Sequence, residues 1–455
     1  MLILEDKVNE VGYKRSERGQ VLVLIVLAVV ALLGFTALAV DGSMVYSDRR
    51  QIQNSADAAS LGGGGRAAMI LENTHVTDWN WTCTLTGVLD AQNQARTVAA
   101  ARAADNGFVL NSNDLDLSDR HGVTTQCGMD TSSGWPEKFV DIRVMLTGDS
   151  DSSFAQFVFK GPLRNSVEAI TRVRPRTNAA FGHAIVALNP SNCSGNSYGV
   201  VVNGNLDVNV DGGGIFSNGC LSGTGTASEV NVTNGSIAYV SEFIPGNTAW
   251  NPNPGSASPM PQDAFDIEPP DCSQVPHFGN PSNAFNTGAT GYIPAGNYTR
   301  INMNGDVTLQ GGGLYCLYGN FDTGNVNVSV LPSGGKTGVT IYLISGSFLT
   351  SGNGSVVLTA PPFSPDPFPA IPGLLVYLAR GNNGLVKLRG NSGSYYQGTI
   401  FAPSGNIDQA GTDDAQAFSS QLIGNNVFIS GHVRLDVYFT ANMMYQIPAR
   451  LYLYR

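Results

Sequence analysis

One uncharged run of twenty residues decides the layout of this chain: Val21-Leu-Val-Leu-Ile-Val-Leu-Ala-Val-Val-Ala-Leu-Leu-Gly-Phe-Thr-Ala-Leu-Ala-Val40. As a helix that rises about 1.5 Å per residue, the run covers about 30 Å, which is the thickness of the hydrocarbon core of a bilayer. Most of its residues are Leu, Ile, Val or Phe, and each of these contributes roughly −0.3 to −0.6 kcal/mol to membrane insertion. The run therefore predicts a transmembrane helix over residues 20–40.

The charges on either side of this run predict its orientation. The residues before it include Lys7, Lys14, Arg15 and Arg18, whereas the first charge after it is Asp41. The positive-inside rule therefore predicts a cytoplasmic segment 1–19 and an extracytoplasmic remainder. The alternative is a cleaved secretory signal, because Ala37-Leu38-Ala39 matches the A-x-A cleavage pattern, but the apolar run is longer than a typical signal. Both readings place the rest of the chain outside the cytoplasm.

Composition indicates a β-rich exported protein. Charged residues make up only 13% of the 455 residues, Gly accounts for 54 of them, and hydrophobic residues still reach 42%. Few charges and many glycines are typical of short strands joined by tight turns, and the hydrophobic content argues against disorder. The net charge of −10 argues against nucleic acid as a partner.

The six cysteines indicate disulfides. None of them forms a C-x-x-C pair, which argues against zinc and thioredoxin-type chemistry. In an oxidising compartment an even number of cysteines is typical of disulfides, although six allow about 15 connectivities. The simplest connectivity pairs them in sequence order: Cys83 with Cys127, Cys193 with Cys220, and Cys272 with Cys316.

The segment after the span predicts a small α+β domain over 41–178. Apolar residues follow a helical stripe through 43–61, so the membrane helix is expected to continue into water. The run Gly62-Gly63-Gly64-Gly65 is expected to end or fray it, because each Gly costs about 1 kcal/mol relative to Ala. A second helix is predicted over 88–105 and alternating strands over 140–146 and 167–173, whereas the apolar run 154–159 fits no clear state. A long membrane helix followed by a small α/β unit is the layout of a pilin-like protein.

The N-terminal sequence resembles a known family. Three short motifs carry the resemblance, in the order Arg18-Gly19-Gln20, Ala39-Val40-Asp41, and Arg49-Arg50-Gln51-Ile52-Gln53-Asn54-Ser55-Ala56-Asp57-Ala58-Ala59. Together they resemble the TadE/TadG-like proteins of Flp (tight-adherence) pilus assembly. The resemblance implies a bacterial inner-membrane protein of that system. A processed prepilin would carry Glu five residues after Gly19, where this chain has Leu24, and this difference favours the unprocessed TadG-like branch.

The larger half, 179–455, is a series of short β-rich segments. They run from 184–188 to 433–439 and are separated by Gly, Asn, Ser or Asp, with turn dipeptides such as Asn203-Gly204 and Asn353-Gly354. This pattern favours a right-handed parallel β-helix (a solenoid), with a β-sandwich as the alternative. Pro-rich stretches at 245–294 and 361–372 are predicted to be loops around it, because Pro cannot donate to a strand ladder.

The sequence predicts no catalytic residue, cofactor or metal site. The five histidines are isolated, and no nucleophile, phosphate-loop or dinucleotide motif is present. Because β-helices also host polysaccharide lyases, the charged residues of the last third form a weak catalytic candidate: Arg380, Lys387, Arg389, Asp408, Asp413 and Asp414. Their spacing requires no such role, and we expect a protein that is not an enzyme.

These observations predict a membrane-anchored, non-enzymatic component of Flp-type pilus assembly or surface adhesion. The expected partners are the lipid bilayer, other pilus-assembly proteins or pilin, and surface glycans, with self-association through the N-terminal helix. One alternative is a membrane-tethered β-helix that binds or degrades carbohydrate. Another is a minor pilin or tip adhesin within the fibre. The expected location is the bacterial inner membrane, with a single pass and a cytoplasmic N-terminus.

Overall fold

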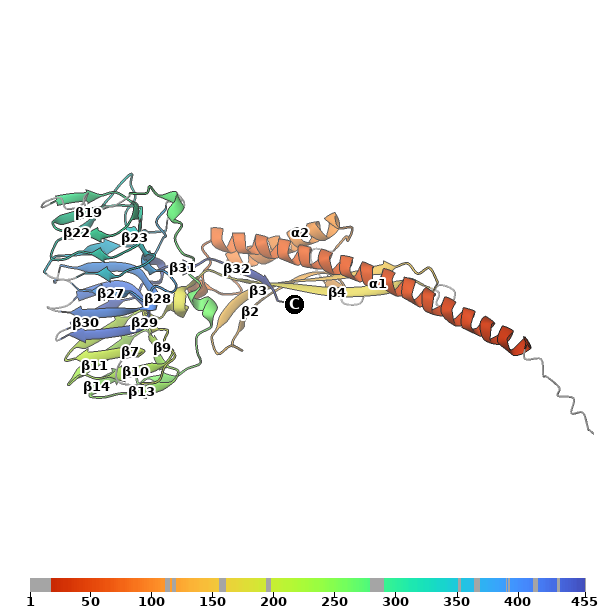
Figure 1. Cartoon of the computed structure of the whole chain (residues 1–455), viewed down its shortest axis with the longest axis horizontal. Helices are drawn as coiled ribbons and strands as arrows, with labels where there is room; N and C mark the ends of the chain where they lie inside the picture. Colours follow the sequence, from red (N-terminus) through yellow and green to blue (C-terminus); the bar gives the residue numbers. More distant parts are fainter. Residues whose placement is uncertain are drawn as a thin grey trace, which may run out of the picture.

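The protein is a long stalk that carries a block-shaped head (Figure 1). The computed structural model describes residues 18–110, 115–116, 120–154, 161–193, 198–278, 290–350, 353–363, 369–389, 391, 393–411, 416–431 and 434–454. The stalk consists of residues 18–174 together with the last strand of the chain, and the head consists of the parallel strands between residues 185 and 438. Two linkers, 175–184 and 439–449, join the head to the stalk.

The N-terminal helix α1 (Arg18–Asn73) is 56 residues long and forms the spine of the stalk. Its first part is exposed on all sides, and an 18-residue window there has a mean hydropathy of 3.1 with no buried residue. In the described part of the chain this is the one helix that is long and apolar enough to cross a membrane. These features fit a membrane anchor, because exposed leucines and valines would be unfavourable in water.

The expected helix end at Gly62–Gly65 is wrong, since α1 continues through all four glycines to Asn73. A Cβ on Gly63 would lie 2.8 Å from the carbonyl oxygen of Ala95, and one on Gly64 would lie 2.5 Å from Cγ2 of Thr171. The glycines therefore let α1 approach a second helix and the sheet beneath it. Tertiary packing offsets the low helix propensity of Gly.

A five-stranded antiparallel sheet lies against α1 and α2 (Thr86–Asp105), which matches the predicted second helix. Val140, Ile142, Val144 and Leu146 of one strand are fully buried against the helices. The predicted strands at 140–146 and 167–173 lie within β3 and β4, and residues 155–159 of the unassigned run lie outside the described residues. The strand order in the sheet is β1 (Leu115–Asp116), β2 (His121–Asp130), β3 (Glu137–Ser150), β4 (Leu163–Arg174) and β32 (Arg450–Leu453).

The head is predominantly β, and its strands stack in three parallel ladders. The first ladder runs through β14 (Thr248–Asn251), β11 (Ser228–Thr233), β8 (Asp207–Asp211), β30 (Arg434–Tyr438), β29 (Gln416–Gly431), β28 (Tyr395–Gly411) and β25 (Val357–Thr359). A Val328–Val356 bridge continues it into β22 (Val328–Leu331), β19 (Asp306–Gln310) and β16 (Thr290–Ile293).

The other two ladders share the long strands β28 and β29 with the first. The second contains β15 (Gly255–Ser256), β12 (Ile237–Tyr239), β9 (Ile215–Ser217), β6 (Ile185–Ala187), β26 (Leu374–Leu378), β23 (Val339–Leu343), β20 (Gly313–Leu317) and β17 (Gly296–Tyr298). The third contains β13 (Glu242–Ile244), β10 (Cys220–Gly223), β7 (Val200–Gly204), β27 (Leu385–Leu388), β24 (Phe348–Leu349), β21 (Phe321–Asp322) and β18 (Ile301–Asn302). These parallel pairings differ from the antiparallel sheets of a β-sandwich.

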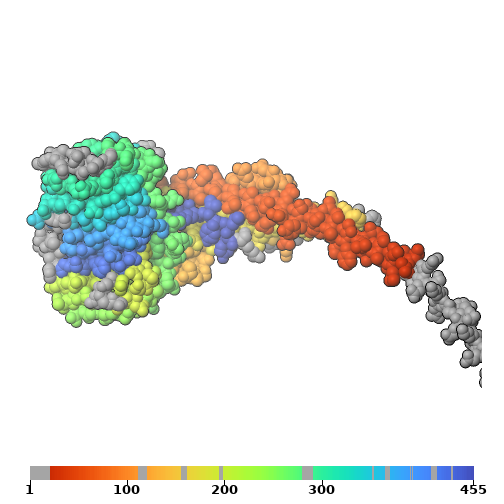
Figure 2. Space-filling view, viewed as in Figure 1, coloured from red at the N-terminus to blue at the C-terminus, as the bar shows by residue number. Residues whose placement is uncertain are grey.

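The chain enters and leaves the head near the middle of the stack. It first winds from β6 to one end at β15, crosses along the outside through residues 257–276, and then winds back from β17 to β30. Strand β29 then pairs with β6 and β7, and β30 pairs with β8, so the first and last parts of the head meet at a seam. In Figure 2 the last part (blue) lies directly against the first (yellow-green). Asn426 accepts hydrogen bonds from Asn189 and Gly199 at this seam and donates one to Asn406.

The head differs from the expected division of the chain in two respects. The chain does not end in the head, because its last strand β32 pairs with β4 of the stalk. The Pro-rich stretch 245–294 is not all loop, since it contains β14, β15 and β16. β14 and β15 each pair with only one other strand, so they lie at the edge, where Pro is tolerated. The rest of the stretch includes the crossover, which packs against the second ladder through Phe265 and Ile267.

Candidate functional site

The family-type motif of α1 divides into a buried and an exposed set of residues. On the buried side, Ala56 and Ala59 are fully buried against the rest of the stalk, and Gln53 donates hydrogen bonds to the Asp57 carboxylate and to the carbonyl oxygen of Glu168. These residues hold α1 on the sheet. Arg18, Gly19 and Gln20 lie within α1 as well, at the start of the apolar part.

Asp41, the first charge after the apolar run, holds a loop of the stalk against α1. Its side chain is only 5% exposed, and it accepts hydrogen bonds from the backbone N–H groups of Ser153 (2.8 Å) and Phe154 (3.1 Å). Charge-assisted bonds of this kind are stronger than neutral ones. The loop after β3 is therefore fixed beside the end of the apolar run.

The remaining motif residues lie on the open side of α1. Arg49, Arg50, Gln51, Asn54 and Ala58 are all exposed, and none of them packs into the core of the stalk. The Arg50 guanidinium lies 5.9 Å from the centre of the Tyr46 ring, one helical turn closer to the apolar run. This side of α1 is available for contacts outside the chain.

An arginine sandwich stabilises the other face of the stalk sheet. The Arg172 guanidinium lies between the rings of Phe139 and Tyr454, at 3.8 and 3.9 Å from their centres. It also donates to Asp141 (2.8 and 2.9 Å) and Asp130 (2.9 Å). Hydrogen bonds from Ser132 and from Arg172 lower the pKa of Asp130 to about 2, and the bonds to Asp141 raise the pKa of Arg172. The sequence analysis missed this group, although alternating charges in the predicted strands were a signal of a polar face.

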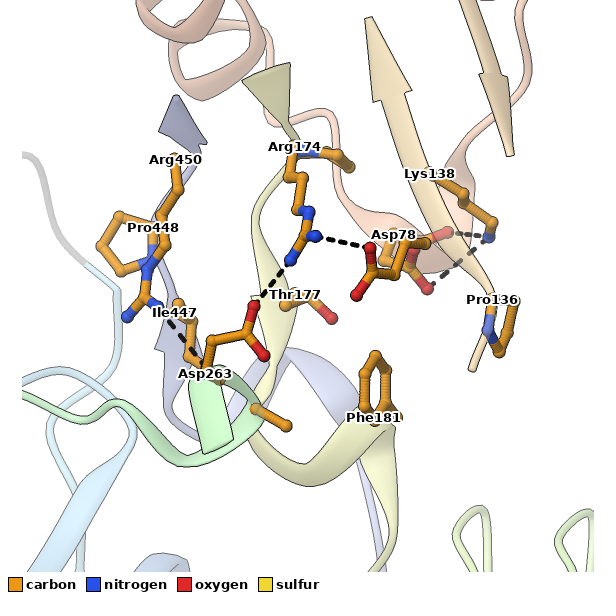
Figure 3. A pocket seen from close by; sticks show the side chains of 13 residues that line it. Asp78, Pro136, Lys138, Arg174, Thr177, Phe181, Asp263, Ile447, Pro448 and Arg450 are labelled. Carbon is orange, nitrogen blue, oxygen red and sulfur yellow. Dashed lines mark hydrogen bonds and ion pairs between the residues drawn. The ribbon is translucent and has the colours of Figure 1, made fainter. Parts of the chain in front are cut away.

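Ion pairs, which Figure 3 shows, and an aromatic contact join the stalk to the head. Arg174 of β4 contacts Glu137 of β3 and Asp263 of the crossover, the latter at 2.6 Å. Trp135 stacks on Phe181 of the linker with ring centres 5.0 Å apart. The cavity between these residues holds only about 50 Å³. A space of this size accommodates a few water molecules.

All six cysteines form disulfides in the sequential order that the sequence favoured. Cys83–Cys127 joins the α1–α2 connection to β2, Cys193–Cys220 ties a loop to the third ladder, and Cys272–Cys316 ties the crossover to β20. Each bridge fastens a connecting segment to regular structure.

The charged residues weighed for catalysis are only partly brought together. Arg389 donates to Asp408 at 3.0 Å, and Lys387 is the register partner of Asp408 on the neighbouring strand. Arg380 instead contacts Asp266 of the crossover, while Asp413 and Asp414 lie outside the described residues. Within the described ranges, no group of three or more His, Cys, Asp or Glu side chains could hold a metal ion.

The head has an open groove of about 560 Å³ that crosses β27, β28, β29 and β7. Phe428 lies in it at a half-buried, outward-facing position, beside Asp408 on one strand and Val201 on the other. Polar side chains surround the ring: Asn203, Thr224, Asn406, Asp408 and Ser430. An aromatic ring among amides and hydroxyls is suited to a ligand with both apolar faces and polar edges.

Residues 19–68 match the family model described as putative Flp pilus-assembly TadE/G-like. The match covers the apolar run and the motif on α1, so the N-terminal part of this chain is similar to that family. No curated protein and no solved structure gives a significant match to the chain.

Proposed function

We propose that the protein is a non-enzymatic component of a bacterial Flp-type pilus-assembly or surface-adhesion system, anchored in the inner membrane. The observation that carries the proposal is the TadE/G-like domain on an exposed apolar helix of membrane-spanning length. A family with this description implies other pilus-assembly proteins as partners. The surface that we assign to them is the part of the open side of α1 that lies further along the helix, at the exposed motif residues Gln51, Asn54 and Ala58.

We further propose that the head is a right-handed parallel β-helix, presented on the outer side of the membrane. The three parallel ladders support the first part of this proposal. The three disulfides support the second, because disulfides persist in oxidising compartments. The positive charges before the apolar run favour a cytoplasmic N-terminus.

Deletion of the gene tests the role in pilus assembly. The deletion strain is expected to lack Flp-type pili or adhesion, and the full-length gene in trans is expected to restore them. A deletion strain with normal pili and normal adhesion would overturn the proposal. Protease added to spheroplasts tests the orientation: it should remove the head and spare an N-terminal tag, and the opposite pattern would contradict the proposed topology.

Carbohydrate binding by the head is a second candidate function, favoured by the groove around Phe428. Few of its polar residues are charged, and Asp408 is paired with Arg389, which suits a neutral glycan. The purified full-length chain in detergent should then bind neutral glycans on an array, and Phe428→Ala should lose this binding. Absence of binding by the wild-type chain would exclude this function for the glycans tested.

Incorporation into the fibre is a third candidate, since the exposed apolar part of α1 would also suit helix packing within a pilus. Recovery of the protein in sheared, washed pili would support this candidate. Recovery in the membrane fraction alone would contradict it.

A further inference from the structure

The stalk bears a ring of exposed apolar side chains just beyond the apolar run. Phe154, Met44 and Tyr46 are 44%, 41% and 64% exposed. Met44 lies on the side of α1 that faces the loop after β3, where Ser153, the neighbour of Phe154, contacts its sulfur atom. Tyr46 lies on the open side of α1. Large exposed apolar groups on both sides of a helix, close to one level, are unfavourable in water, and they indicate a contact with something less polar.

The level of this ring is fixed by Asp41. The backbone of Phe154 is bonded to the carboxylate of Asp41, so Phe154 lies beside the first residue after the apolar run. Met44 and Tyr46 are four and six residues beyond Val40, which corresponds to about 6 and 9 Å along the helix axis. The headgroup layer of a bilayer adds about 5–8 Å on each side of the hydrocarbon core. Met44 and Phe154 therefore lie at the depth of the interface. The backbone of Tyr46 lies just beyond it, and its ring reaches the interface because helical side chains lean toward the N-terminus. Tyr and Phe are favoured at this depth.

Two exposed arginines lie one turn above the ring. Arg49 and Arg50 are exposed, and no ion pair joins either to an acidic side chain in the described part of the chain, although the protein carries 35 acidic residues. Helical side chains lean toward the N-terminus, and the position of the Arg50 guanidinium over Tyr46 shows this direction. The Arg50 guanidinium therefore points toward the membrane, and the same lean is expected of Arg49, so both can reach lipid phosphates.

We propose that the foot of the stalk, defined as Met44, Tyr46, Arg49, Arg50 and Phe154, is a binding surface for the phospholipid headgroups of the adjacent leaflet. The ring of apolar side chains enters the interface, and the two arginines pair with phosphates. This proposal depends on the proposed membrane anchor and adds a second contact to it. A second contact beside the helix would fix the angle at which the stalk leaves the membrane. The occupant is the bilayer, since the surface is continuous with the spanning segment and its charge complements phosphate.

Depth-dependent quenching tests the apolar part of this surface. The full-length chain is reconstituted into vesicles that contain lipids brominated near the headgroup, with Tyr46→Trp or Phe154→Trp as the probe. Leu89→Trp, an exposed position on α2, is the control. Both probes should be quenched and blue-shifted, and the control should be neither. Flotation of the protein with the vesicles tests the membrane anchor separately. Protein that floats with the vesicles but has unquenched probes would overturn the proposed headgroup-binding surface and leave the anchor intact.

Lipid selectivity tests the arginines. Phosphatidylglycerol that remains bound to the full-length chain is counted by native mass spectrometry after release from nanodiscs of mixed phosphatidylglycerol and phosphatidylcholine. The wild-type chain should retain phosphatidylglycerol, and the Arg49→Gln/Arg50→Gln variant should lose that preference. Arg96→Gln/Arg102→Gln on α2 removes the same charge and should retain it. Equal retention by both variants, or efficient crosslinking of two copies through position 46, would overturn the proposal.

Discussion

At the scale of single residues, the packing of the stalk depends on positions where one added carbon atom would cause a steric clash. The four consecutive glycines of α1 illustrate this, because they differ in what a side chain would meet. A Cβ on Gly64 would clash with Thr171, whereas a Cβ on Gly65 would meet no atom within 4 Å. The same substitution should thus have opposite effects at adjacent positions.

We predict that Gly64→Ala destabilises the stalk by about 1–3 kcal/mol, the usual cost of overpacking a core. Gly65→Ala should instead leave the stability unchanged or raise it by up to about 1 kcal/mol, because Ala is the better helix former. The measurement is the urea midpoint of the full chain in detergent, followed by circular dichroism. Equal shifts for the two variants would contradict the close packing of α1 on β4.

Asp41 provides the second prediction at this scale. Its replacement by Ala removes the charged acceptor of two partly buried backbone hydrogen bonds, which costs about 1–3 kcal/mol. Amide hydrogen exchange over the loop that contains Ser153 and Phe154 should accelerate roughly 5- to 150-fold. Asp48→Ala, two turns further along α1, removes the same charge away from this loop and should leave its exchange unchanged. Unaltered protection of the loop in Asp41→Ala would contradict the role of this carboxylate.

At the scale of elements, periodicity predicted most of the structure and failed where long-range packing decides. The second helix, β3 and β4 follow from their 3.6- and 2-residue patterns. The end of α1 could not be predicted from such a pattern, because the residues that fill the space beside Gly63 and Gly64 come from α2 and β4. Strand β13 was also missed, because it has three residues and lies beside the Pro-rich stretch. Asp41 could be singled out from the sequence, whereas its partner loop lies 112 residues away.

The linker between the stalk and the head is an element with its own pH dependence. Ala180 and Phe181 have positive φ angles of 52° and 51°, and His183 follows with its Nδ1 at 3.0 Å from the carbonyl oxygen of Ala180. Burial lowers the pKa of His183 below its ordinary 6.5, with a smaller opposing contribution from that bond. In the folded protein the imidazole thus stays neutral at pH values where the unfolded chain binds a proton.

The sign of the effect follows from this difference. As the pH falls below about 6.5, the unfolded state gains a proton that the folded state does not, so this group makes the protein less stable in acid until the folded pKa is reached. His183→Asn keeps a donor for Ala180 but cannot titrate, and its stability should fall less between pH 7 and pH 5. The measurement is the difference in melting temperature between wild type and variant at each pH. A constant difference across this range would contradict the prediction.

At the scale of the whole molecule, the head is joined to the stalk near the middle of its stack of strands. This arrangement follows from the route of the chain, in which β6 and β29 pair across the seam although the residues that meet there are up to 237 positions apart. No local pattern encodes such a pairing, because each partner is far away in the sequence. The consequence is that two linkers, not one, leave the centre of the head toward the stalk (Figure 1).

The second linker ends in β32, which covers the edge of β4 in the stalk sheet. Tyr452 and Tyr454 of this segment contact Arg174 and Arg172, and the N–H of Tyr454 donates to the carbonyl oxygen of Ile170. Deletion of residues 450–455 would leave β4 as an unpaired edge and remove several hydrogen bonds, each worth about 0.5–1.5 kcal/mol. We predict at least several-fold faster amide exchange over β4, with unchanged exchange over β26 and β28 in the head. Tyr454→Ala is the control, since it keeps the strand and removes one ring, and it should have a smaller effect on β4. The prediction assumes that the head stays folded when the stalk sheet opens. Loss of amide protection in the head together with β4 would contradict it and would show that the stalk and the head unfold as one unit.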